Sequence, residues 1–135
     1  YHEGYEWLEL DELCKVADFI SVHVPLTSQT KGMIDEKRIS LMKDGVILIN
    51  TSRGGLINED DLVNALNSGK IYAAGLDVIS EEPPRHDLGI LHCENATITD
   101  HIAYLPKTSR LRSVSVAISN FKAYLDGCPT SVINK

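Results

Sequence analysis

Three side chains with complementary chemistry each follow a predicted β-strand in this 135-residue chain. Arg53 follows a short apolar run, and Glu82 and His101 each follow a segment typical of a strand. Arginine binds a carboxylate through a planar pair of donors, and histidine gives or takes a proton near neutral pH. A carboxylate beside the histidine fixes its tautomer and favours its charged form. Together these residue types suit reduction of a 2-oxo acid: arginine binds the acid, a cofactor delivers hydride to the carbonyl, and histidine protonates the forming alkoxide.

Each residue alone also has an ordinary structural explanation. Arg53 fits a solvated surface charge, and Glu82 beside Glu81 fits an exposed pair in a loop. His101 fits a capping or packing role, and Asp77 fits the end of a strand that bonds the following turn. The residues alone therefore establish an α/β domain with a candidate anion site.

Strands and helices alternate along the chain. Strands are predicted over 19–24, 46–49, 71–78 and 96–99, and helices over 8–17, 35–42, 58–69 and 106–125. Asp11 and Asn58 are predicted N-caps, and His23 is expected to pack or to bond the backbone inside the first strand. Short connections between alternating elements are typical of βαβ units with a parallel sheet. Arg53, Asp77 and His101 would then meet at the carboxyl edge of that sheet, where open α/β folds bind ligands.

Composition excludes several classes of protein. With 13 Lys and Arg against 19 Asp and Glu, the net charge is −6, which disfavours nucleic acid and anionic membranes as partners. The longest apolar run, 46–49, is far too short to cross a bilayer, and no signal peptide is visible. Three cysteines without C-x-x-C spacing favour reduced thiols and a cytoplasmic location. No histidine or cysteine spacing indicates a metal site.

The glycine pattern limits what a dinucleotide-binding fold could contain. No two of the nine glycines are spaced two apart, so G-x-G-x-x-G is absent from this stretch. If the fold binds a dinucleotide, the half that holds the pyrophosphate lies outside these residues.

Several ordered motifs together resemble a known family. They are ADFISVHVPLT at 17–27, TKGMI at 30–34, LINTSRGG at 48–55, AGLDV at 74–78, Glu82-Pro83, and HIA at 101–103. In this order and spacing the chain resembles the D-isomer-specific 2-hydroxyacid dehydrogenases, most closely their glycerate dehydrogenase/hydroxypyruvate reductase branch. The resemblance implies a Rossmann-type domain, of which this chain is the second, nicotinamide-binding half with a long C-terminal helix. Residues 1–126 would belong to that domain, and 127–135 would return towards a substrate domain.

The resemblance also implies roles for individual residues. Arg53 would bind the substrate and polarise its carbonyl, His101 would be the general acid and base, and Glu82 would orient and charge that histidine. Asp77 would contact the nicotinamide half of NAD or NADP. The expected cofactor contacts are Val24, Pro25, Thr51, Ser52, Arg53, Asp77, His101 and Ala103.

By this resemblance, the full-length protein would interconvert a small 2-oxo acid, of the hydroxypyruvate or glyoxylate type, and its D-2-hydroxy acid. It would act as a homodimer, and the 135-residue chain alone would be inactive. The alternative is a non-catalytic, NAD-sensing scaffold, like the corepressors of the same superfamily.

Two positions bear on which branch of the family the chain resembles. Asp100 stands where the family usually has proline, and Glu82 stands where the formate-oxidising branch has glutamine, which disfavours that branch.

Overall fold

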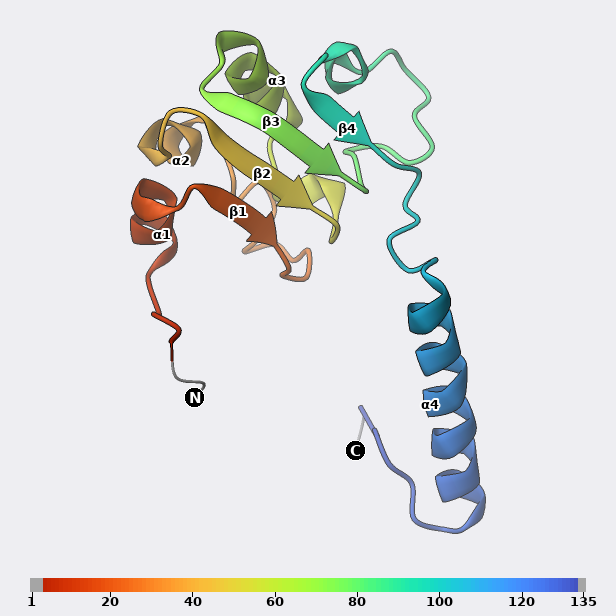
Figure 1. Ribbon diagram of the computed structural model, residues 1–135. Coiled ribbons are helices and arrows are strands. Elements are labelled where there is room, and N and C mark those ends of the chain that lie inside the picture. Colours follow the sequence, from red (N-terminus) through yellow and green to blue (C-terminus); the bar gives the residue numbers. More distant parts are fainter. Residues whose placement is uncertain (1–3, 134–135) are drawn as a thin grey trace. The chain divides into compact units, whose positions relative to one another are not determined.

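The computed structural model describes residues 4–133 and divides into two compact units, Tyr1–His101 and Ile102–Lys135 (Figure 1). The first unit contains a sheet and its helices, and the second contains one long helix. The division between the two units falls after His101. The predicted boundary after residue 126, between the NAD-binding domain and a tail that returns towards a substrate domain, stays a prediction.

A parallel sheet organises the first unit. Its strands are β1 (Phe19–Val22), β2 (Val46–Asn50), β3 (Ile71–Leu76) and β4 (Ala96–Ile98), in the order β1-β2-β3-β4. All three pairings are parallel, so the four carboxyl ends lie at one edge, as the arrows in Figure 1 show. The predicted α/β class with a parallel sheet is confirmed.

One face of the sheet carries the core. Ile20 of β1, Leu48 of β2 and Ala74 of β3 are in register and buried. Phe19, directly before Ile20, points to the opposite face and is exposed. The hydrophobic core therefore lies on the face that the first-unit helices cover.

Three strands end earlier than the sequence predicts, and β4 does so by one residue, at Ile98. β1 ends at Val22 and β3 at Leu76, because both pair with Asn50, the last residue of β2. Beyond that point the ladder has no partner strand. His23 consequently lies outside the strand and is exposed, so the expectation that it packs inside β1 is wrong.

The helices of the first unit begin with different caps. They are α1 (Leu10–Val16), α2 (Glu36–Leu41) and α3 (Glu59–Ser68), with 3₁₀ turns η1 (Gly54–Leu56) and η2 (Gly89–His92). The predicted cap of α3 is confirmed, since the Asn58 side chain accepts from the Asp61 amide. The predicted Asp11 cap is wrong: Glu9 is the N-cap residue of α1. Asp11 instead binds the Arg38 guanidinium at 2.8 Å, which makes it part of the α1–α2 packing.

The second unit contains α4 (Lys107–Leu125), which confirms the predicted long helix. Pro106 precedes its first turn, and Gly127 follows it with a φ of +72°. None of the α4 residues is buried, including the apolar ones at helical spacing. No helix in residues 4–133 is long and apolar enough to cross a membrane.

Candidate active site

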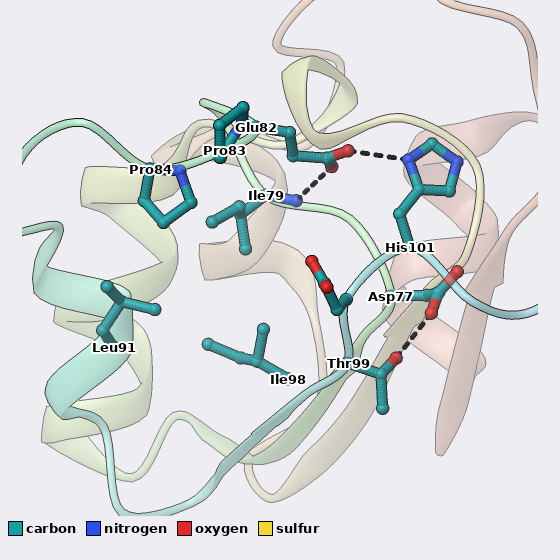
Figure 2. Close-up of a pocket in the computed structure, with 10 residues that line it drawn as sticks. Asp77, Ile79, Glu82, Pro83, Pro84, Leu91, Ile98, Thr99 and His101 are labelled. Carbon is teal, nitrogen blue, oxygen red and sulfur yellow. Dashed lines mark hydrogen bonds and ion pairs between the residues drawn. The ribbon is translucent and has the colours of Figure 1, made fainter.

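Glu82 and His101 form a hydrogen-bonded pair. His101 Nδ1 lies 2.7 Å from Glu82 Oε2, and Glu82 Oε1 accepts from the Ile79 amide at 3.0 Å (Figure 2). A carboxylate offers only acceptors, so the hydrogen of this bond is on Nδ1. The other ring nitrogen, Nε2, takes no part in this bond. The pair predicted from the sequence is therefore brought together.

The backbone of His101 is held in an uncommon conformation. Its φ of +49° lies in the left-handed region, which few residues other than glycine adopt. The His101 amide compensates by donating to the carbonyls of Asp77 and Thr99, each at 3.0 Å. Such conformations persist where the surroundings fix them, and they concentrate at functional sites.

Asp77 lies at the end of β3 with only 5% of its surface exposed. Its carboxylate accepts from the Thr99 hydroxyl at 2.5 Å, and its amide donates to the Asn50 carbonyl at 2.9 Å. These bonds join the ends of β2, β3 and β4 at one point. Asp77 is thereby fixed beside His101 at the carboxyl edge, as the strand order predicts.

A cavity of about 420 Å³ adjoins these residues. Asp77, Glu82, Thr99, Asp100 and His101 supply its polar lining, and Ile79, Pro83, Pro84, Leu91 and Ile98 complete it (Figure 2). Asp100, which stands where the family usually has proline, is therefore part of this lining. The Glu82–Pro83 peptide bond in the same wall is cis.

Asn50 shapes the loop after β2 that carries Arg53, although the sequence did not single it out as a site residue. Asn50 is 1% exposed; its Nδ2 donates to the Arg53 carbonyl at 2.9 Å, and its Oδ1 accepts from the Ser52 amide at 3.0 Å. The Ser52 hydroxyl donates to the Val22 carbonyl at 2.8 Å. Asn50 is a polar residue at the end of an apolar strand, and that signal could have marked it.

Arg53 borders a second hollow of about 510 Å³, lined by His23, Val24, Pro25, Leu26, Ser52 and Arg53. Its guanidinium donates to the Ser52 carbonyl at 2.6 Å and is exposed. His23 Nε2 lies 2.7 Å from Ser21 Oγ. Four of the expected cofactor contacts, Val24, Pro25, Ser52 and Arg53, therefore line the same hollow. Thr51 is exposed in the same loop, and Ala103 belongs to the second unit, so their roles stay predictions.

Gly54 lets the loop that carries Arg53 pack closely against the loop that carries Glu82. A Cβ on Gly54 would lie 1.7 Å from the Ile79 carbonyl oxygen and 2.7 Å from the Ser80 nitrogen. Only a residue without a side chain permits this approach. The chain segments that carry Arg53 and Glu82 are thus in direct backbone contact.

The residues at this edge fit the nicotinamide half of a dinucleotide. Val24, Pro25 and Leu26 offer an apolar wall for a flat ring, and Ser52 and Arg53 offer donors for the polar groups attached to it. Among residues 4–133, no group of three or more His, Cys, Asp or Glu is placed to hold a metal ion.

The chain is similar to several proteins of known name. It is 48% identical over 134 residues to a hydroxypyruvate reductase of Blautia hydrogenotrophica, covering 99% of this chain and 42% of that protein. A D-lactate dehydrogenase from Aquifex aeolicus, solved with NAD and lactic acid, is 42% identical with a TM-score of 0.76 over 90% of this chain and 41% of that one. An acyclic imino acid reductase, solved with NADPH and D-Arg, is 32% identical with a TM-score of 0.88 over 99% of this chain and 43% of that one.

The chain thus spans about two-fifths of the length of these relatives. Residues 1–103 match the family model of the D-isomer specific 2-hydroxyacid dehydrogenase NAD-binding domain. That match covers most of the chain, and the fold, the sheet-edge site and the relatives agree with it. The chain therefore belongs to the D-isomer specific 2-hydroxyacid dehydrogenases and carries part of their NAD-binding domain.

Proposed function

We propose that the full-length protein containing this chain reduces a small 2-oxo acid, such as hydroxypyruvate or glyoxylate, to its D-2-hydroxy acid, and catalyses the reverse reaction. The observation that carries this proposal is the Glu82–His101 pair, with its 2.7 Å bond, at the same sheet edge as the Arg53 loop. The similarity to a hydroxypyruvate reductase supports the substrate class. It also favours an enzyme over the NAD-sensing scaffold.

Each residue of the proposed site has a defined role. Arg53 binds the substrate carboxylate with its planar fork and polarises the neighbouring carbonyl. His101 holds the transferable proton on Nε2 and gives it to the oxygen as the alcohol forms, while Glu82 keeps Nδ1 engaged and stabilises the charged ring. A bound nicotinamide cofactor supplies the hydride in reduction and accepts it in oxidation.

The cofactor contacts belong to the same proposal. Asp77 contacts the nicotinamide half, and the hollow beside Arg53 holds the rest of that half. Thr51 and Ala103 are further proposed contacts of the cofactor. Both NAD and NADPH occur among solved relatives, so both are candidate cofactors. A homodimer and a cytoplasmic location complete the proposal.

The proposal is tested by following oxidation of NADH and NADPH with hydroxypyruvate, glyoxylate and pyruvate, using the full-length protein and the 135-residue chain separately. We expect turnover that yields the D-enantiomer from the full-length protein and none from the shorter chain. Arg53→Ala should lower kcat/KM about a hundredfold or more, because a charged interaction with the substrate is lost. The matched control is Arg85→Ala, whose side chain is 79% exposed in the loop after Pro84. Absence of turnover with every 2-oxo acid, or equal effects of the two arginine variants, would contradict the proposal.

A further inference from the structure

Two neighbouring amides in the Glu82 loop are each held by a glutamate. The Ile79 amide donates to Glu82 Oε1 at 3.0 Å, and the Ser80 amide donates to Glu59 Oε2 at 2.9 Å. Figure 2 shows the first of these bonds and its continuation from Glu82 to His101. The two successive peptide groups that meet at the Ile79 Cα, Val78–Ile79 and Ile79–Ser80, therefore each donate to a carboxylate, one in the acid–base pair and one outside it.

Glu59 comes from a rigid element. It is the first residue of α3, directly after the N-cap Asn58, and α3 packs against β3 and η2. Glu59 is half-buried and lines a small hollow together with Gly54 and Ile79. Glu59 therefore reaches the Glu82 loop at the place where Gly54 also contacts it.

From these contacts we infer that Glu59 is a positioning residue for the Glu82–His101 pair, an inference that rests on the proposed function. Glu59 fixes the Ser80 amide and with it the Ile79–Ser80 peptide plane. That plane shares the Ile79 Cα with the preceding Val78–Ile79 plane, which presents the Ile79 amide to Glu82. Glu82 is then held with Oε2 directed at His101 Nδ1. Glu59 touches no reacting group, so its effect passes through the backbone of residues 79–80.

The alternative role of Glu59 is a favourable interaction of its negative charge with the N-terminus of α3. Asp60 and Asp61 also lie in that first turn, and Asp61 Oδ2 accepts from the Glu36 amide at 2.9 Å. Asp60 is exposed and gives the matched control, since it shares the helix end but not the bond to Ser80. A role limited to the helix end would make Glu59 and Asp60 equivalent.

The first experiment is amide hydrogen exchange, followed by NMR, on the 135-residue chain. In Glu59→Ala we expect exchange at both Ser80 and Ile79 to rise about tenfold, while Asp60→Ala leaves both unchanged. In Glu59→Gln both amides should stay protected, because the amide oxygen of glutamine also accepts from Ser80. An increase at Ser80 alone would overturn the inference, because Ile79 and Glu82 would then be held independently of Glu59. Equal behaviour of Glu59→Ala and Asp60→Ala would overturn it as well.

The second experiment measures hydroxypyruvate reduction by the full-length protein. Glu59→Ala should lower kcat about tenfold, the effect of losing one hydrogen bond to a charged group, with KM within twofold of wild type. Glu59→Gln should restore kcat. A raised KM with unchanged kcat would overturn the positioning role. If the wild-type protein itself fails to turn over, the proposed function fails, and the exchange of Ile79 still decides whether Glu59 orders the Glu82 loop.

Discussion

Replacing Asn50 tests whether one buried amide shapes the Arg53 loop. Asn50→Ala removes the donor to the Arg53 carbonyl and the acceptor for the Ser52 amide, at a residue that is 1% exposed. Ser52 is half-buried and Arg53 exposed, so water partly replaces the lost partners and each bond costs about 1 kcal/mol. The space left by the amide costs about 1 kcal/mol more. We expect the free energy of unfolding to fall by about 3 kcal/mol.

Asn50→Asp separates hydrogen bonding from packing at this position. The substitution keeps the volume and the acceptor for Ser52, but it places a second oxygen against the Arg53 carbonyl. It should therefore destabilise the chain at neutral pH as much as Asn50→Ala does. Urea unfolding of the 135-residue chain measures both variants, with Asn64→Ala, an exposed position in α3, as the control within about 0.5 kcal/mol of wild type. An Asn50→Asp variant as stable as wild type would refute the assignment of the hydrogen bond from Asn50 Nδ2 to the Arg53 carbonyl.

Two further predictions concern backbone contact and buried thiols. Gly54→Ala should force residues 79–80 to move, because the new Cβ would lie 1.7 Å from the Ile79 oxygen, and should lower the free energy of unfolding in urea by about 1–3 kcal/mol. The control Gly89→Ala, whose nearest neighbour to the new Cβ lies at 3.6 Å, should be tolerated. Equal costs for the two variants would contradict this account. Burial raises the pKa of the Cys14 and Cys93 thiols, so the stability linked to them is present below the ordinary thiol pKa and is lost as pH rises above it, because the unfolded chain releases those protons first. A Cys14→Ala/Cys93→Ala variant should show a shallower loss of stability in urea unfolding above about pH 8.5, and an identical slope would count against this effect.

The sheet was predictable because its signals are local. Apolar, β-branched runs bounded by Pro25 or by Gly45 identify the strands, and Asn58 identifies the start of α3. The strand ends were not predictable, because β1 and β3 stop where their common partner β2 stops at Asn50. The role of Asp11 was not predictable for a similar reason, since its partner Arg38 lies 27 positions away in the sequence.

The site was predictable in its residue types but not in its supports. Arg53, Glu82 and His101 were recognised from motifs, and the structure places Glu82 against His101. The bond between Glu59 and Ser80 and the contact between Gly54 and Ile79 join segments more than 20 residues apart. No local pattern records such contacts, because they arise only when α3 packs beside the end of β3.

A matched pair of histidine variants tests the acid–base claim most directly. His101 and His92 each bond a carboxylate, at 2.7 Å and 2.6 Å, but only His101 lines the cavity at the sheet edge. The measurement is kcat/KM for hydroxypyruvate in the full-length protein carrying His101→Gln or His92→Gln. We expect a loss of at least about a hundredfold for His101→Gln, the usual contribution of a general acid, and a value within about twofold of wild type for His92→Gln. A His101→Gln variant that keeps more than a tenth of wild-type kcat/KM would contradict the assignment of His101 as the proton donor.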